Sequence, residues 1–326
     1  MIDNLQPELA PIVLFTYNRP RHTEQTLNAL MQNKLASEST LYIYCDGPKK
    51  NASEADLAKI ENVRKIIKKE NWCKTVHIIE SVKNQGLATS IRTGVTDIVK
   101  KHGKVIVMED DLLTSSAFLT YMNKALNYYE TRKSVFSISA YCLPPKKFQI
   151  PNDYHYDVFV GLRNSSWGWA TWSDRWQQVD WDVAVFNEIK ENPEIKEALN
   201  RRGDDVFEML EMQQSGKLDI WSIQFTVAHF KNHAVSIIPT ISYVDNIGFD
   251  GTGENCGVTE ALKNTYLSEN ENIRFIDILY QDKRITNAFY SAYYRKKRPV
   301  LKKIVNRLSR TFFKKNIFII KRKIYC

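Results

Sequence analysis

Residues 105–113 read VIVMEDDLL, an apolar run that leads into three adjacent carboxylates before apolar residues return. The four apolar residues that open the stretch predict a buried strand. Two interpretations of Glu109, Asp110 and Asp111 are open. Acidic residues are favoured near a helix N-terminus because of the helix dipole, and residues 112–130 have the composition of a helix. Alternatively, the three carboxylates form a divalent-cation site at the carboxyl edge of a sheet.

The chain before this stretch alternates between two kinds of segment. Short runs rich in β-branched and aromatic residues predict strands, and amphipathic segments with helical spacing predict helices, one of them capped by Ser53. The predicted strands are residues 11–17, 40–45, 74–82 and 104–111, and the predicted helices are residues 21–33, 53–70 and 86–103. Such alternation with short connections predicts an α/β fold with a mostly parallel sheet.

Polar residues follow three of the predicted strands, at the edge where ligands bind in such sheets. They are Asn18 with Arg19, then Asp46, and then the acidic cluster Glu109, Asp110 and Asp111. No GxGxxG sequence follows the first strand, and GxxxxGK[ST] occurs nowhere in the chain. These absences argue against a dinucleotide-dependent dehydrogenase and against a P-loop kinase.

Composition sets broad limits on the class of protein. The 326 residues are 43% hydrophobic, which is enough for one large domain or two intimately packed halves. The five cysteines include no CxxC pair, so a reduced, cytoplasmic protein is the simplest expectation. The first residues show no signal-peptide pattern, and no uncharged apolar stretch reaches the ~20 residues of a membrane-spanning helix.

The net charge of +9 is distributed unevenly along the chain. Residues 283–326 hold fifteen Lys and Arg and no acidic residue, whereas the remaining 282 residues carry a net charge of −6. We therefore expect a catalytic body, residues 1–282, and a basic amphipathic tail, residues 283–326. The strand and helix alternation ends near residue 134, so the body divides into a nucleotide-binding half, residues 1–115, and a mixed acceptor half, residues 116–282.

Several motifs occur in an order that resembles a known family. APIVLFTYNRP, YCDGP, NQGLATSIRTG and VIVMEDDL resemble the GT-A glycosyltransferases, and more specifically the bacterial relatives of the animal N-acetylglucosaminyltransferase I group. SSWGWATW, DIWSIQF and NIGFDGTGENCG extend the resemblance to a polysaccharide-forming bacterial subgroup, over roughly residues 10–260. The resemblance implies a GT-A fold, in which a Rossmann-like half binds the nucleotide and a mixed half binds the acceptor.

The resemblance also implies roles for the acidic cluster. Asp111 would ligate Mn²⁺ or Mg²⁺, cations that prefer hard oxygen ligands, and Asp110 and Glu109 would hold the ribose side of the donor or orient waters on the ion. Such a cation bridges two phosphate oxygens and stabilises the nucleoside diphosphate as it leaves.

Further donor-binding residues are implied at the other strand ends and in the third helix. Arg19 would contact the nucleotide and its phosphates, with Thr16 and Asn18 beside it, Asp46 would accept a hydrogen bond from uracil, and Arg92 would lie near the diphosphate. Two alternatives stay open. Asp46, before Gly-Pro, has the sequence of a turn residue that bonds its own backbone, and Arg19 has that of a solvated loop residue.

A catalytic base is needed if transfer inverts the sugar's configuration, because a carboxylate then takes the proton of the acceptor hydroxyl. Some relatives place an aspartate directly after a tryptophan, but here Trp221 is followed by Ser222. Asp219 is the first candidate and Asp250 the second. A surface position without catalytic function is the alternative for both residues.

Five tryptophans between residues 167 and 181 suggest a loop that stacks on sugar rings. We assign Trp167, Trp169 and Trp221 to acceptor or sugar contact, with core packing as the alternative. In the tail, Leu301, Ile304 and other apolar residues recur at helical spacing among lysines and arginines, the pattern of a helix lying on an anionic membrane. A helix docked on the body is an open alternative, whereas contiguous apolar residues argue against a nucleic-acid arm.

Together these features predict a metal-dependent glycosyltransferase of the hexosyl or N-acetylhexosaminyl class, peripheral on the inner face of the cell membrane. Its donor would be a nucleotide sugar, linked to UDP in the simplest case, and its acceptor a lipid-linked saccharide in lipopolysaccharide O-antigen or capsule synthesis. It would bind no nucleic acid. Two other classes remain open: a sugar-1-phosphate nucleotidyltransferase, for which FTYNRPRH lacks the expected glycine-rich loop, and a non-catalytic membrane-associated binding protein.

Overall fold

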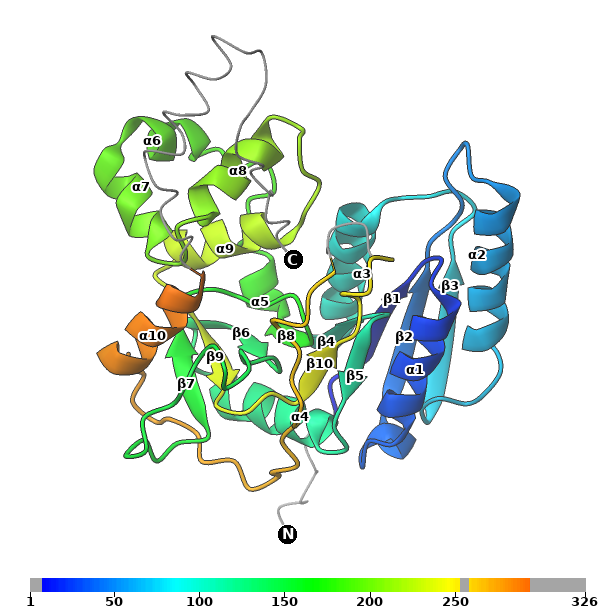
Figure 1. Cartoon of the computed structure of the whole chain (residues 1–326), viewed down its shortest axis with the longest axis horizontal. Helices are drawn as coiled ribbons and strands as arrows, with labels where there is room; N and C mark the ends of the chain where they lie inside the picture. Colours follow the sequence, from blue (N-terminus) through cyan, green and yellow to red (C-terminus); the bar gives the residue numbers. More distant parts are fainter. Residues whose placement is uncertain (1–7, 253–257, 294–326) are drawn as a thin grey trace.

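The computed structural model describes residues 8–252 and 258–293, which contain an eight-stranded mixed sheet and a two-stranded sheet (Figure 1). The order of strands in the large sheet is β3-β2-β1-β4-β8-β6-β9-β7, and β10 pairs with β5 in the small one. The strands are β1 (Ile12–Thr16), β2 (Thr40–Cys45), β3 (Thr75–Glu80), β4 (Lys104–Glu109), β5 (Leu112–Thr114), β6 (Val135–Ser139), β7 (Val158–Gly161), β8 (Trp169–Trp172), β9 (Val235–Pro239) and β10 (Val244–Asn246).

The first half of the chain has the predicted architecture. Strands β1 to β4 pair with one another in parallel, and they alternate with three helices, α1 (Pro20–Met31), α2 (Glu54–Ile67) and α3 (Leu87–His102). Each of the seven predicted segments is present, and Ser53 caps α2 by accepting a hydrogen bond from the Asp56 amide at 3.1 Å. The predicted α/β fold class with a mostly parallel sheet in this half is confirmed.

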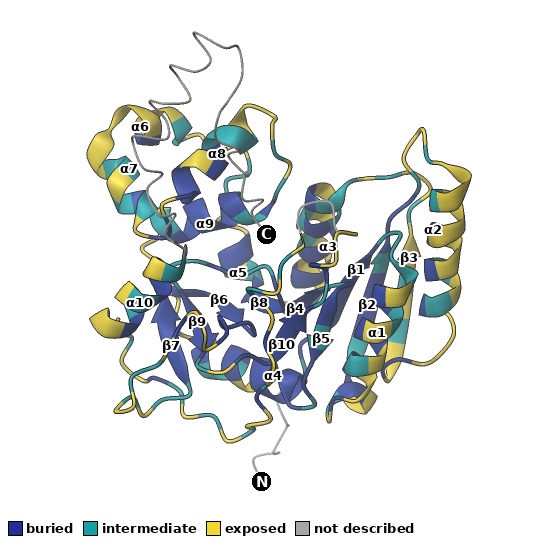
Figure 2. Cartoon of the chain, in the orientation of Figure 1, coloured by how far each residue is buried: buried dark blue, intermediate teal, exposed yellow. Residues whose placement is uncertain are grey.

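Alternate residues of β1 face opposite sides of the sheet, as strand geometry requires. Ile12 and Leu14 join a core with α1, α2 and α4 (Phe118–Tyr129), whereas Val13 and Phe15 join a second core with α3. Figure 2 shows β1, β2 and β4 mostly buried and the outer faces of the flanking helices exposed. Both faces of these central strands are thus covered, so a ligand reaches them at the strand ends.

The second half is mixed, and it begins with an antiparallel insertion. Strand β8 lies between β4 and β6 and runs antiparallel to both. It is formed by Trp169–Trp172, so the prediction of a tryptophan-rich loop is wrong for these residues. The helices that follow are α5 (Ser173–Trp176), α6 (Phe186–Glu191), α7 (Pro193–Asn200), α8 (Val206–Gln214) and α9 (Ser222–Lys231), and α6 to α9 enclose a small core of their own.

Helix α10 (Lys283–Tyr293) begins where we placed the start of the basic tail, yet it packs against the body. The Phe289 ring lies 5.4 Å from those of Phe148 and Phe159, and Ile285 is buried in the main core. The predicted membrane helix from Leu301 onward lies outside the described residues. Within the described part of the chain, no helix combines the length and the apolar character needed to cross a membrane.

Candidate active site

One cleft with a volume of about 230 Å³ lies at the carboxyl ends of β1, β2 and β4 and extends to the second half of the chain. All the predicted donor-binding residues except Arg92 line it, as does Asp111. The facing wall comes from residues 163–167, which connect β7 to β8, and from residues 220–226 at the start of α9. The strand ends therefore bring together residues that are 90 positions apart in sequence.

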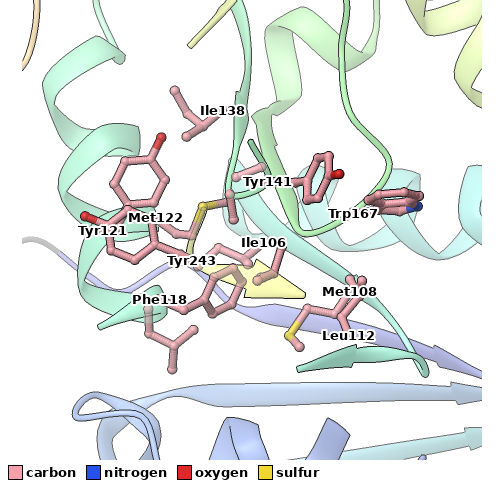
Figure 3. Packing of buried hydrophobic residues seen from close by; sticks show 14 of the residues in the cluster. Ile106, Met108, Leu112, Phe118, Tyr121, Met122, Ile138, Tyr141, Trp167 and Tyr243 are labelled. Atoms are coloured by element: carbon pink, nitrogen blue, oxygen red, sulfur yellow. The ribbon is translucent and has the colours of Figure 1, made fainter. Parts of the chain in front are cut away.

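The acidic cluster is held between buried apolar residues. Met108 and Leu112 on either side of it have no exposed surface, and they pack with Ile106 and Phe118 (Figure 3). The chain continues into β5 rather than into a helix, and α4 has no acidic residue in its first turn. The interpretation of Glu109, Asp110 and Asp111 as helix-terminal residues is therefore wrong, and the strand-end interpretation is confirmed for their position.

Arg19 is ion-paired with two of these carboxylates. Its Nη1 donates to Asp111 Oδ2 at 3.0 Å, and its Nη2 donates to Asp110 Oδ1. Burial lowers the pKa of Arg19, but the two carboxylates outweigh burial and hold the pKa above its ordinary value. Arg19 is thus an internal counter-ion of the acidic cluster, and the solvated-loop alternative is wrong.

The acidic residues themselves are difficult to ionise together. Burial first, and then the charge of Asp111, raises the pKa of Glu109 to about 8. Burial also raises the pKa of Asp110, although Arg19 opposes this shift. A carboxylate in such surroundings is stabilised by any further positive charge.

The donor set fits a divalent cation that takes few protein ligands. Among the residues that the structure describes, the buried Asp110 Oδ2 has no hydrogen-bond partner, and Asp111 Oδ1 has only a 3.5 Å contact with Asn246 Nδ2. Both are hard oxygens of the kind that Mg²⁺ and Mn²⁺ prefer. Among the described residues no group of three or more His, Cys, Asp and Glu is arranged to hold a metal, and Mg²⁺ usually completes its coordination with substrate phosphates and water.

The loop after β10 closes over Asp111. The Ile247 amide donates to the Asp111 carbonyl at 2.9 Å, and the Gly248 amide donates to Asn246 Oδ1 at 2.8 Å. A Cβ atom at Gly248 would overlap Asp111 Oδ2. Only glycine therefore allows the backbone to lie this close to the carboxylate, which accounts for the glycine in the motif NIGFDGTG.

Asp46 holds the loop between β3 and α3 in place. Its carboxylate accepts four hydrogen bonds: Oδ1 from the amides of Gly47 and Gln85, both at 2.8 Å, and Oδ2 from the Gly86 amide at 3.1 Å and Asn84 Nδ2 at 2.9 Å. A carboxylate has about four acceptor positions. Asp46 thus bonds the adjacent backbone, as the turn-residue alternative predicts, and it also fixes the loop that leads into α3. Its contact with uracil stays a prediction.

The wall opposite the carboxylates contains one self-neutralising ion pair and several neutral polar groups. Arg163 forms a bidentate pair with the buried Asp205, at 2.7 and 3.1 Å. Next to it, Asn164 Oδ1 lies 2.6 Å from the Thr226 hydroxyl. Sequence analysis did not assign these residues, and the run Arg-Asn-Ser-Ser before Trp167 is the only signal that pointed to them.

The tryptophans divide into two groups. Trp167 and Trp221 line the cleft, so their role in sugar contact stays a prediction. Trp169 does not line it: the side chain is 1% exposed and stacks on Trp221 at 4.6 Å within the core next to α3. The prediction of sugar contact by Trp169 is therefore wrong, because its position in β8 directs it into the sheet core.

Three other predicted residues lie outside the cleft. Arg92 packs over the Trp181 ring at 4.6 Å, so its assignment to the diphosphate is wrong. Asp219 is exposed at the rim, where its Oδ2 lies 3.6 Å from the place of a Cβ on Gly86, a residue of the cleft wall. Asp250 is also exposed, and it pairs with His22 at 3.2 Å and with Thr252. As catalytic bases, Asp219 and Asp250 stay predictions.

Known proteins resemble this chain in fold but not in sequence. No family model matches it, and no curated protein sequence does. A mannosyltransferase from Pyrobaculum calidifontis, solved with GDP-mannose and Mn²⁺, shares 11% identity over 52% of this chain and 49% of its own, with a TM-score of 0.34. Residues 1–349 of TarS from S. aureus share 11% over 72% and 59%, with a TM-score of 0.38.

A UDP-glucose pyrophosphorylase complexed with UDP-glucose is similar to the same degree, with 12% identity over 72% of this chain and 91% of its own and a TM-score of 0.35. The chain spans about half the length of the first two proteins. The similar solved structures thus include a mannosyltransferase and a UDP-glucose pyrophosphorylase. At these TM-scores the similarity does not discriminate between the two activities.

Proposed function

We propose that the protein is a glycosyltransferase that moves a sugar from a nucleotide-sugar donor, UDP-linked in the simplest case, to a saccharide acceptor. The observation that carries this proposal is the composition of one cleft. Its strand-end half has Arg19 between Asp110 and Asp111, and its other half has aromatic and neutral polar side chains. A nucleoside diphosphate suits the first half, and a sugar suits the second.

The roles of the charged residues follow from their positions. Arg19 provides a guanidinium that matches phosphate oxygens in a bidentate manner, while Asp110 and Asp111 offer oxygens to a divalent cation. A bound cation would neutralise charge that develops on the leaving nucleoside diphosphate. The chain itself contributes the orientation of these groups, since Met108 and Leu112 fix the carboxylates and Gly248 closes over Asp111.

The connection between β1 and α1 favours a glycosyltransferase over a nucleotidyltransferase. Only residues 17–19 lie between Thr16 and Pro20, and none of them is glycine. A nucleotidyltransferase that uses a nucleoside triphosphate needs a longer glycine-rich loop here, whose amides can surround the phosphates. This short turn presents a single arginine instead.

The acceptor and the tail complete the proposal. We propose a lipid-linked saccharide as the acceptor, at the inner face of the cell membrane, because residues 283–326 carry fifteen basic and no acidic residues. Since α10 packs on the body, deleting residues 296–326 should leave a folded protein that binds UDP. That protein should lose binding to vesicles containing phosphatidylserine; equal sedimentation of both proteins with these vesicles would contradict the membrane role.

The test of the main activity is a panel of UDP, GDP and dTDP sugars, with and without Mn²⁺, measured by thermal shift and by product analysis. A bound donor raises the melting temperature by mass action. We expect stabilisation by one nucleotide class together with Mn²⁺, and slow release of the nucleoside diphosphate. Formation of a nucleotide sugar from a sugar phosphate and a nucleoside triphosphate would show the alternative activity. Absence of binding by every nucleotide would contradict both.

A further inference from the structure

Asn164 has an unusual environment for a side chain in the wall of the cleft. It is 7% exposed, and its Nδ2 is buried without a hydrogen-bond partner among the described residues. Buried amide groups are nearly always paired, because an unpaired one loses its bonds to water without replacement. Asn33, which is 4% exposed and has partners for both ends of its amide, shows the usual arrangement.

Thr226 of helix α9 holds one end of the Asn164 amide. The Thr226 hydroxyl lies 2.6 Å from Asn164 Oδ1 and 2.9 Å from the Ser222 carbonyl, and its single proton can bond only one of them at a time. In either case the other end of the Asn164 amide stays unpaired. A ligand hydroxyl, which both donates and accepts, satisfies that end whichever way the amide is turned.

The surroundings of Asn164 select a neutral ligand. The neighbouring Arg163 already has a bidentate partner in Asp205, so this pair brings no net charge to the wall. The same wall of the cleft also carries the hydroxyls of Ser165 and Ser166, the rings of Trp167 and Trp221, and the apolar side chains of Met209 and Ile223. Neutral hydrogen-bonding groups beside aromatic rings are the combination that a carbohydrate, with its hydroxyls and apolar C–H faces, can satisfy.

We infer that Asn164 reads a hydroxyl of a carbohydrate bound in the half of the cleft that faces the carboxylates, and so contributes to sugar specificity. This inference rests on the proposed function for the nature of the donor. The hydroxyl belongs either to the transferred sugar or to the acceptor saccharide. A site that is built to bond a hydroxyl discriminates strongly against analogues that lack it, since its own buried group is then left unpaired.

The test compares wild type with Asn164→Ala, and with Asn33→Ala as a control for loss of a buried asparagine remote from the cleft. Affinities are measured by titration calorimetry for UDP, UDP-glucose, UDP-galactose and UDP-N-acetylglucosamine, and for deoxy analogues of the tightest binder. Retention on a glycan array is measured in the presence of UDP and Mn²⁺. If Asn164→Ala does not fold, Asn164→Leu, which fills the same space, takes its place.

If Asn164 bonds the transferred sugar, Asn164→Ala lowers the affinity for the nucleotide sugar about 10- to 100-fold, because one buried hydrogen bond is lost. The affinity for UDP is then unchanged. One deoxy analogue then binds the variant and wild type equally. If the acceptor is read, donor affinity is unchanged and glycans retained by wild type are lost. The inference is overturned if neither changes, if UDP weakens equally, or if Asn33→Ala has the same effect.

These results also separate the inference from the proposed function. Wild-type protein that binds glycans through Asn164 but binds no nucleotide would contradict the glycosyltransferase assignment and support the inference. The opposite result is that wild type binds nucleotide sugars with Mn²⁺, and that Asn164→Ala changes neither this binding nor retention on the glycan array. That result would support the glycosyltransferase assignment and contradict the inference.

Discussion

The polar side chains in the two halves of the cleft differ in charge and in how that charge is balanced. In the strand-end half, the positive charge of Arg19 faces the carboxylates of Asp110 and Asp111 within the same few ångströms. In the opposite half, Arg163 and Asp205 neutralise each other, and the remaining polar groups near Asn164 are uncharged. Buried ions need opposite charges, whereas neutral groups need only hydrogen bonds. The first half therefore suits a ligand that brings charge, and the second suits one that brings hydroxyls.

The halves also differ in what positions them. The carboxylates lie directly between strands β4 and β5, so the sheet and the small hairpin with β10 fix them. Asn164 lies in a connection between strands, and the hydrogen bond with Thr226 orients its side chain. Sites on regular elements are held more rigidly than sites on loops. We expect substitutions in the strand-end half to alter chemistry, and those in the loop half to alter selectivity.

The largest expected effect is that of Asp111→Ala in the strand-end half. Transfer should fall by at least about 10³-fold, because a group that stabilises developing charge is removed, and the donor should no longer bind more tightly with Mn²⁺. Arg19 still pairs with Asp110, so the fold should survive. Turnover and Mn²⁺ titration are the measurements, with Asp245→Asn as a control for a buried aspartate outside the cleft. Near-normal turnover with Mn²⁺ would disprove the metal assignment.

A pair of tryptophan substitutions tests which tryptophan contacts ligand in the half of the cleft opposite the carboxylates and which one only packs in the core. Trp169→Ala should lower the free energy of unfolding by about 3–5 kcal/mol, the usual loss for a fully buried aromatic side chain, without changing ligand affinity of the folded protein. Trp167→Ala should cost less stability and should weaken saccharide binding. Urea unfolding and calorimetry distinguish them. Loss of sugar affinity in Trp169→Ala alone would reverse the assignment.

Sequence periodicity was sufficient to predict the positions of site residues in the strand-end half of the cleft, but not in the opposite half. Alternating strands and helices have strong patterns, and parallel strands necessarily bring their carboxyl ends to one edge. The positions of Thr16, Arg19 and Asp111 follow from those two facts. The order of the large sheet beyond β4, in which β8 inserts next to it, does not follow from any local pattern, and this misplaced Trp169.

Side-chain partners could not be predicted from the sequence because they depend on tertiary distance. Asp46 follows a strand like the other site residues, yet its carboxylate accepts three hydrogen bonds from the loop at residues 84–86 and a fourth from the Gly47 amide. Arg92 lies in a family-like motif, but the helical phase of α3 turns it toward Trp181. The polar run before Trp167 was the only signal for Asn164, because the significance of this residue arises from a missing partner, and only a folded chain shows that.

Asp219→Asn tests whether the rim between the two halves supplies the catalytic base. Turnover should fall by about 10²-fold or more, the scale of general-base catalysis, while UDP affinity stays almost unchanged because Asp219 does not line the cleft. Initial rates and calorimetry measure the two quantities. A full effect in Asp250→Asn and none in Asp219→Asn would move the role to Asp250, and a parallel loss of UDP affinity would make Asp219 a binding or structural residue.

Arg19→Met sharpens the comparison by removing the only cation in the strand-end cluster that the structure shows paired with Asp110 and Asp111. UDP affinity should fall about 10- to 100-fold, as expected for loss of charged hydrogen bonds. Binding of Mn²⁺ without nucleotide should become tighter, since the cation no longer competes with the guanidinium. Calorimetry with each ligand alone tests both, with Arg132→Met as a remote control. Unchanged Mn²⁺ affinity would show that Arg19 does not act as a counter-ion.

The smallest effect concerns the pH dependence of stability, which should arise in the charged half and not in the neutral one. The pKa of Glu109 is raised from 4.5 to about 8 in the folded chain, chiefly by burial and then by Asp111. The folded state therefore binds more protons than the unfolded state between these values, so the free energy of unfolding falls as pH rises from about 4.5 to about 8. Because Glu109 is partly exposed, we expect a decrease on the order of 1–2 kcal/mol rather than the full value of the shift.

Urea unfolding with EDTA and no nucleotide measures this decrease. Glu109→Gln should flatten most of the slope, and the residual slope belongs to Asp110, whose pKa is raised in the same direction. The exposed Glu188→Gln should leave the slope unchanged. A wild-type protein whose stability rises with pH over this interval would show that Glu109 is ionised in the folded state, and that the cluster accepts a third negative charge without a cation.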